Sequence, residues 1–269
     1  MSTTTAPAAT PVFDALRDAL RADAPVALAT VTAGVGIGAK LLVGPSRPPL
    51  GSLGHPDLDR VVTRDALGAL EAGTTVTRHY GPHGEAREDD VSVFIESFAP
   101  PPRMVIFGAV DFTAALAHTA KLLGYRVTVC DARAAFATPV RFPMADEVVC
   151  EWPDRYLAAH GATLGPRDAV CVLTHDTKFD VPAIAAALDT RVGYLGAMGS
   201  RRTHARRVER LREAGIDDTA LERLLAPIGL DLGARTPEET AIAVCAEIIA
   251  RRTGRHAPSL RHTAGSIHG

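Results

Sequence analysis

The second part of the chain alternates short apolar runs with segments of helical periodicity, and this alternation limits the fold more than any other feature. The apolar runs are rich in valine and too short for helices. We expect strands at residues 104–107, 126–130, 147–149, 169–173 and 192–195, and helices at 113–123, around Arg155, at 181–188 and at 201–214. Buried strands separated by helices are typical of a parallel sheet with right-handed crossovers, which predicts a Rossmann-like, doubly wound α/β fold.

A proline-rich run, Ala99-Pro100-Pro101-Pro102, separates this part from the residues before it. Such a run continues neither a helix nor a strand, and it has the stiffness of a linker. Upstream of it we expect helices at 12–22 and 60–72 and strands at 26–31, 40–43 and 91–98. The sequence therefore predicts a smaller N-terminal α+β domain over residues 12–99, a Rossmann-like domain over 103–254, and a loosely ordered tail over 255–269.

The last helix of the second domain has well-marked ends. The sequence Thr236-Pro237-Glu238-Glu239 offers a capping threonine, a proline in the first turn and a glutamate that completes a capping box, while Gly254 marks the stop. We expect the apolar stripe of this helix to pack into the core. It consists of Ile242, Cys245, Ile248 and Ile249.

Composition excludes several classes of partner. With 269 residues, of which 46% are hydrophobic, the chain can bury a full core. A net charge of −2 creates no overall field for nucleic acid or an anionic membrane, so we expect neither as a partner. No run approaches the ~18 apolar residues of a spanning helix, and the N-terminus lacks the pattern of a secretory signal, so we expect a cytoplasmic protein.

Cysteines and histidines give no metal-binding pattern. The cysteines lie far apart in apolar surroundings, without C-x-x-C spacing, and are expected to be buried and reduced. They are Cys130, Cys150, Cys171 and Cys245. The closest histidines, His79 and His83, are separated by Gly81-Pro82, which prevents a shared helix face and favours a solvated loop.

One half of a dinucleotide-binding fingerprint is present. Gly108 follows the first strand of the second domain, and Asp131 ends the next strand 23 positions later, where a ribose-binding acid is expected. The turn between them lacks the second and third glycines, because it reads Gly108-Ala109-Val110-Asp111-Phe112-Thr113. Val110 would obstruct a pyrophosphate and Asp111 would repel it, so NAD(P) in the usual pose is disfavoured. A plain strand-to-helix turn with a helix cap is the alternative for Gly108 and Asp131.

A stronger candidate anion site lies at Gly196-Ala197-Met198-Gly199-Ser200-Arg201-Arg202. There a strand passes through small residues into a helix that Ser200 can cap, so amide groups, the helix dipole and two guanidinium groups converge. We expect Gly199, Ser200, Arg201 and Arg202 to hold a phosphate, including that of a pterin. The later arginines are expected to form a solvated helix face paired with Glu209 and Glu213. They are Arg206, Arg207 and Arg210.

A third group of polar residues ends the strand before this one. Thr174-His175-Asp176, followed by Lys178 and Asp180, should open into the same crevice, because ligands in this fold bind at the carboxyl ends of strands. His175 could donate to a ligand or move a proton. Capping of the loop by Asp176 and simple solvent exposure are the alternatives. No arrangement of catalytic residues is specific enough to identify a reaction.

These motifs resemble the XdhC/CoxI family. Its C-terminal pattern is matched by Leu173-Thr174-His175-Asp176, by Tyr194 through Arg202, and by Ala226-Pro227-Ile228-Gly229-Leu230-Asp231-Leu232-Gly233. The N-terminal domain matches at Pro25–Thr30, at Gly38-Ala39-Lys40-Leu41-Leu42 and at Gly51-Ser52-Leu53-Gly54, so the resemblance extends from Val12 to Gly254.

The resemblance implies an accessory protein that binds molybdenum cofactor and delivers it to a molybdoenzyme of the xanthine dehydrogenase or carbon-monoxide dehydrogenase type. It also implies a cysteine desulfurase as a further partner and is compatible with a homodimer. The cofactor-binding residues would be Gly108, Asp131, Thr174, His175, Asp176, Gly199, Ser200, Arg201 and Arg202.

This chain departs from the family pattern at two motif positions. Many members carry Gly-Gly-Cys where this chain reads His55-Pro56-Asp57, and members read Gly-Ala-Gly-His where it reads Gly108-Ala109-Val110-Asp111. A cysteine contact to molybdenum is therefore not expected here. Two other hypotheses stay open: an NAD(P)-dependent oxidoreductase, and a docking protein whose degenerate Rossmann domain binds no ligand.

Overall fold

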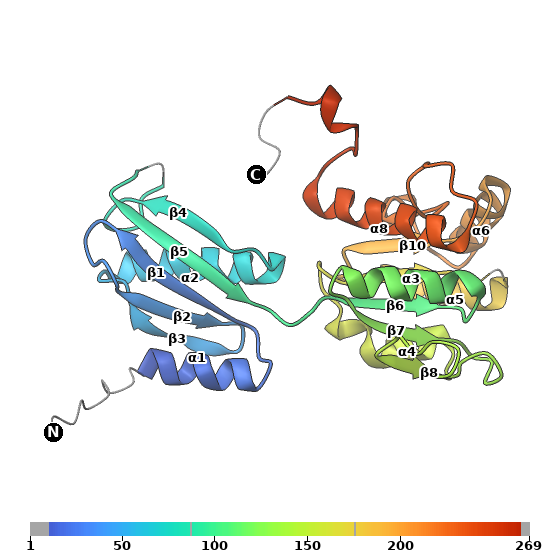
Figure 1. Ribbon diagram of the computed structural model, residues 1–269, viewed down its shortest axis with the longest axis horizontal. Coiled ribbons are helices and arrows are strands. Elements are labelled where there is room, and N and C mark those ends of the chain that lie inside the picture. The colour runs from blue at the N-terminus through green and yellow to red at the C-terminus, as the bar shows by residue number, and fades with distance from the viewer. Residues whose placement is uncertain (1–10, 87, 175, 265–269) are drawn as a thin grey trace, which may run out of the picture. The chain divides into compact units, whose positions relative to one another are not determined.

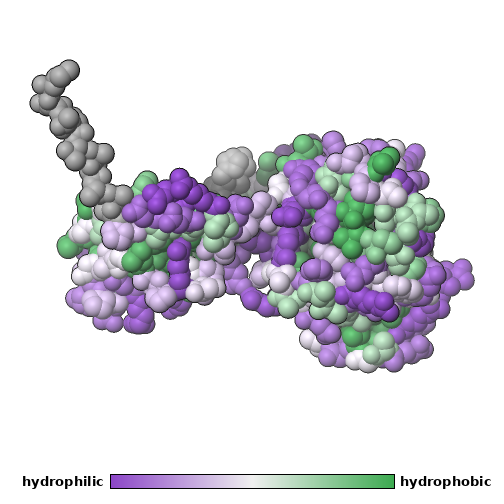
Figure 2. Space-filling view, turned by 90° about the horizontal axis from the view of Figure 1, so that it is seen from below, coloured by the Kyte–Doolittle hydropathy of each residue, from purple (hydrophilic) through white to green (hydrophobic). Residues whose placement is uncertain are grey.

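The computed structural model describes residues 11–86, 88–174 and 176–264. The chain divides into two compact units, Met1–Pro100 and Pro101–Gly269. No helix in the described part of the chain is both long enough and apolar enough to cross a membrane. Hydrophilic residues cover much of each unit on the face shown in Figure 2, with smaller apolar areas between them.

The first unit is an antiparallel sheet with a helix on each face (Figure 1). Its elements are α1 (Pro11–Arg21), β1 (Val26–Ala33), β2 (Lys40–Gly44), β3 (Arg47–Ser52), α2 (Pro56–Ala72), β4 (Val76–Tyr80) and β5 (Val91–Phe98). The strand order is β3-β2-β1-β5-β4. Alternate residues of β1 pack against opposite helices: Ala27 and Ala29 lie on the α2 side, whereas Val26 and Leu28 lie on the α1 side.

Two strands of this sheet, β3 and β4, carry no clear signal in the sequence. Every residue of β3 is exposed, and its two prolines lie in a strand at the edge of the sheet. Proline is tolerated at an edge because its missing N–H group need not remove a hydrogen bond between strands. The β4 strand occupies the other edge and is largely exposed as well. Helix α2 begins four residues before the expected start, because His55 caps it: the His55 Nδ1 atom accepts from the Asp57 N–H at 3.2 Å.

The second unit is a parallel six-stranded sheet between two helical layers, which confirms the predicted fold class. Its elements are β6 (Arg103–Phe107), α3 (Asp111–Leu122), β7 (Arg126–Cys130), β8 (Glu147–Val149), α4 (Pro153–His160), β9 (Ala169–Val172), α5 (Thr177–Leu188), β10 (Tyr194–Ala197), α6 (Arg201–Glu213), α7 (Asp218–Leu221), β11 (Leu224–Leu225) and α8 (Pro237–Thr253). Figure 1 shows α3 and α8 on one side of the sheet and α4 on the other. The expected tail, residues 255–269, contains a short 3-10 turn at Leu260–His262, and its last five residues lie outside the described ones.

The strand order β11-β10-β9-β6-β7-β8 positions the candidate site. The chain runs outward from β6 to β8, then returns to the other side of β6 and continues outward through β9, so the order reverses between β6 and β9. The register aligns the strand ends, because Phe107 pairs with both Cys130 and Val172, and Val172 pairs with Ala197. The loops after these four strands therefore emerge at one edge, around the switch point where ligands bind in this architecture.

The core of the second unit corrects two expectations. The residues of α8 that pack into the core beside α3 are Ala241, Val244, Cys245 and Ile248, whereas Ile242 is 55% exposed and Ile249 is 38% exposed. Helical spacing of three and four residues selects this narrower face, so part of the predicted stripe was wrong.

Among the cysteines, Cys150 is exposed, while the other three are buried, because Cys150 follows the last residue of the edge strand β8.

Thiol reactivity tests this assignment. Burial raises the pKa of Cys130 to about 12 and that of Cys245 to about 11, so these thiols stay protonated as well as inaccessible. A thiol-specific colorimetric reagent should modify a single cysteine rapidly in native buffer, and all four after unfolding. Replacing Cys150 by Ser should abolish the rapid phase, and a rapid phase that persists in this variant would contradict the assignment.

Candidate functional site

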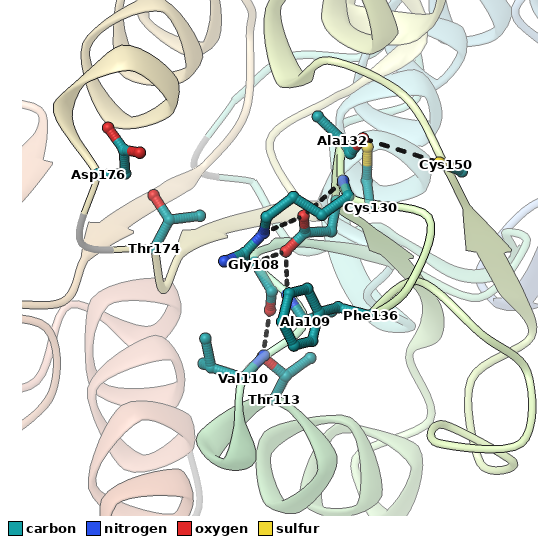
Figure 3. A network of polar contacts seen from close by, with 12 residues as sticks. Gly108, Ala109, Val110, Thr113, Cys130, Ala132, Phe136, Cys150, Thr174 and Asp176 are labelled. Atoms are coloured by element: carbon teal, nitrogen blue, oxygen red, sulfur yellow. Dashed lines mark hydrogen bonds and ion pairs between the residues drawn. The ribbon is translucent and has the colours of Figure 1, made fainter.

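Two of the expected site residues meet at the switch point of the parallel sheet. Gly108 follows β6 and Thr174 comes two residues after the end of the neighbouring β9. Gly108 has φ of 111°, and a Cβ atom built on it would lie 2.9 Å from the Thr174 nitrogen. Only glycine allows this backbone conformation and this close approach. Gly108 and Thr174 thus form the two facing walls of the site (Figure 3).

The carboxylate of Asp131 occupies the turn after β6. One of its oxygens accepts from the Ala109 N–H at 2.7 Å, and the other accepts from the Arg133 N–H at 2.9 Å (Figure 3). The Arg133 guanidinium group binds both oxygens, at 2.9 and 2.7 Å. Burial alone would raise the pKa of Asp131, but these hydrogen bonds outweigh burial and lower it, so the group stays ionised.

Two further groups of this turn are also satisfied from within. The Val110 N–H lies 3.4 Å from the Thr113 hydroxyl, and that hydroxyl donates to the Gly108 carbonyl. A dinucleotide in the usual pose would need the amides that Asp131 and Thr113 already engage. This arrangement adds a second obstacle to the steric one expected at Val110, and it gives Asp131 a structural partner where a ribose contact was expected.

A cluster of two arginines and an aromatic ring borders this turn, and no pattern in the sequence predicts it. Arg133 lies over the Phe136 ring with its Cζ atom 4.5 Å from the ring centroid, and Arg141 lies over the same ring at 5.4 Å. Arg141 also donates to the Ala109 carbonyl at 3.2 Å. Phe136 nevertheless remains 41% exposed. The loop after β7 therefore presents fixed guanidinium groups beside the switch point.

In the turn between β10 and α6, the first N–H groups of the helix remain open beside two exposed arginines. Ser200 caps α6 as expected, with its Oγ atom accepting from the Thr203 N–H at 3.1 Å. The first N–H groups of a helix have no acceptor within it, and those of Arg201 and Arg202 receive no cap from the described residues. Both side chains are exposed, and neither forms an ion pair within the described ranges. This turn can receive an anion without losing an existing contact.

The expectation that the later arginines of α6 form a solvated helix face was wrong at one position. Arg206 and Arg210 are exposed, but Arg207 is buried and pairs with buried Asp180, Nη2 to Oδ2, at 2.9 Å. Arg207 shares an inward face with Leu211, which follows it by one helical turn. Asp180 is the only charged residue between Phe179 and Leu188 of α5, and this isolated charge was the available signal for a buried partner.

The polar residues after β9 divide into buried and exposed ones. Thr174 is buried, and its hydroxyl donates to Asp180. Asp176 is exposed and caps α5 by accepting from the Lys178 N–H at 3.1 Å, with the Lys178 ammonium group 3.3 Å away. This confirms the capping alternative for Asp176, while a ligand contact there stays a prediction. His175 lies outside the described residues.

Metal ligands are not assembled in the described part of the chain. No group of three or more histidine, cysteine, aspartate or glutamate side chains found there could hold a metal ion. His83 does not pair with His79 but packs edge-on against His55, with the ring centroids 4.2 Å apart. Because the His55 Nδ1 atom already accepts the capping hydrogen bond, its free nitrogen is a donor in the neutral ring.

Comparison with known proteins identifies the family to which the chain belongs. A model described as the XdhC Rossmann domain matches residues 104–248, and a model of the XdhC and CoxI family matches residues 19–81. The chain therefore belongs to the XdhC/CoxI family.

Curated relatives agree with this assignment over parts of their length. A protein of Bacillus subtilis (strain 168), described as a probable subunit of xanthine dehydrogenase, is 33% identical over 178 residues, which cover 66% of this chain and 50% of that protein. The molybdenum cofactor insertion chaperone PaoD of Escherichia coli (strain K12) is 34% identical over 99 residues, covering 37% of this chain and 31% of PaoD. The chain spans half or less of the length of these relatives.

A solved structure shares the fold. A crystal structure described as a xanthine dehydrogenase from Bacillus halodurans matches with a TM-score of 0.54 and 20% identity, and the match covers 93% of this chain and 98% of that one. At this level of identity the likeness establishes the architecture.

Replacing Gly108 tests the packing at the switch point. Gly108→Ala should destabilise the second unit by ~1–3 kcal/mol, because the new methyl group meets the Thr174 backbone and φ is unfavourable for alanine. Gly165→Ala in the same unit is the control, since a Cβ there meets nothing within 4 Å, and it should stay within ~0.5 kcal/mol of the parent. Urea unfolding measures both values, and equal stability of the two variants would contradict the close approach.

Proposed function

We propose that this protein is an accessory protein that binds molybdenum cofactor and delivers it to a molybdoenzyme of the xanthine dehydrogenase or carbon-monoxide dehydrogenase type. The observation that carries the proposal is the open turn between β10 and α6, which offers amides and two guanidinium groups that form no ion pair with the described residues. Its position, one strand away from the switch-point wall at Thr174, suits a ligand that combines a phosphate with a ring system.

The chain's own residues fit the organic part of the cofactor. The phosphate would be held by the amides and side chains of Gly199, Ser200, Arg201 and Arg202. The ring system would lie toward Gly108, Thr174, His175 and Asp176, with Asp131 acting through the guanidinium group of Arg133 that it holds. Bound cofactor would bring its own molybdenum, so the protein has to recognise only the pterin and its phosphate.

The partners follow from the relatives. The name of PaoD describes a chaperone for cofactor insertion, and the name of the Bacillus subtilis relative describes part of a xanthine dehydrogenase. By analogy, the client of this chain is a molybdoenzyme of that type. A cysteine desulfurase as second partner, a homodimer and a cytoplasmic location complete the proposal.

An arginine substitution tests the phosphate site. Arg201→Ala should weaken the binding of cofactor released from a purified molybdoenzyme by ~1–3 kcal/mol, the scale of a lost charge-assisted hydrogen bond. Arg210→Ala is the matched control, because Arg210 is exposed on the same helix but lies more than two turns from the cap. Retention of pterin during ultrafiltration measures binding. Unchanged affinity in Arg201→Ala would remove the proposed phosphate site.

A further inference from the structure

We propose that Arg207 is a positioning residue that sets the anion affinity of the turn between β10 and α6 from beneath, without touching the ligand. The inference rests on the proposed phosphate site and adds a residue that the sequence pattern placed in solvent. It also predicts that this site recognises phosphate itself, whatever organic group carries the phosphate.

The guanidinium group of Arg207 lies directly under the turn. Its Nη2 atom donates to the Met198 carbonyl at 2.9 Å, which fixes the backbone just before Gly199. A Cβ atom built on Gly199 would lie 3.7 Å from Arg207 Nη1, and glycine is required there because φ is 145°. Arg207 is 2% exposed, so it positions the backbone of the turn and adds a positive charge beneath it without facing solvent.

One donor of this buried group is unused. Arg207 Nη1 is buried and has no hydrogen-bond partner among the described residues. A buried donor without an acceptor destabilises the fold, and a buried ion pair is seldom more stabilising than an apolar pair of similar volume. Fold stability alone therefore does not account for this arginine. An anion bound at the turn would compensate the buried positive charge of Arg207, because Coulomb attraction is strong where water is excluded.

The partner of Arg207 orients this charge. Asp180, itself 1% exposed, accepts from Arg207 with one oxygen and from the Thr174 hydroxyl with the other. The pair is thus directed, with its positive end under the turn and its negative end toward the loop after β9. Burial and the nearby Arg207 charge lower the pKa of His204, so this histidine adds no charge of its own at neutral pH.

A set of matched variants tests the inference, with inorganic phosphate as the probe. The double variant Asp180→Asn/Arg207→Met removes the pair without leaving an unpaired buried charge, so it should fold, as near-UV circular dichroism can check. Its affinity for phosphate should fall about tenfold or more, measured by calorimetry at constant ionic strength. Arg207→Lys keeps a cation under the turn and should retain affinity within about threefold. Arg210→Met is the surface control and should bind as the parent does.

The outcomes separate this inference from the proposed function. A folded double variant that binds phosphate as tightly as the parent would overturn the role of Arg207, while the phosphate site would stand. A parent protein that does not respond to phosphate would overturn the inference as well. Loss of phosphate binding in the double variant, together with retained binding in Arg207→Lys, would support the role of Arg207 even if the purified protein carried no pterin.

Discussion

The buried carboxylate of Asp180 joins two of the strand ends that form the candidate site, and a third strand end packs against them. It accepts from Thr174 after β9 and from Arg207 in α6, and Arg207 in turn holds the Met198 carbonyl after β10. Gly108 after β6 packs against the backbone of Thr174. Because these contacts lie below the loops, the loops can keep their spacing while their upper surfaces remain available to a ligand.

Two of the strand-to-helix turns at this edge differ in which of their amides are engaged. In the turn after β6, where a dinucleotide would normally bind, the Asp131 carboxylate occupies the Ala109 amide and Thr113 faces the Val110 amide. In the turn after β10, Ser200 caps the helix and leaves the first amides and two arginines open. The fold thus retains a Rossmann architecture, which agrees with the family assignment, while the open amides of the proposed anion site lie after a different strand.

The sequence predicted most of the second unit and less of the first. Strands β6 and β9 are buried on both faces and contain continuous apolar runs, whereas the exposed edge strands β3 and β4 have no such pattern. Site residues at strand ends were predictable from topology. The role of Arg207 was not, because it depends on the Asp180 carboxylate, which lies 27 positions away in the sequence and is brought close by folding. Because α6 is rich in arginine, its sequence did not distinguish Arg207, which faces inward, from the arginines that face solvent.

Whether this chain carries molybdenum cofactor is tested most directly on the protein purified from a host that makes the cofactor. The quantities to measure are co-eluting molybdenum and the fluorescence of the oxidised pterin. We expect both, in a fixed ratio to protein, even though His55-Pro56-Asp57 provides no cysteine to the metal. Absence of both pterin and molybdenum from correctly folded protein would contradict the role of cofactor carrier and would favour a docking protein.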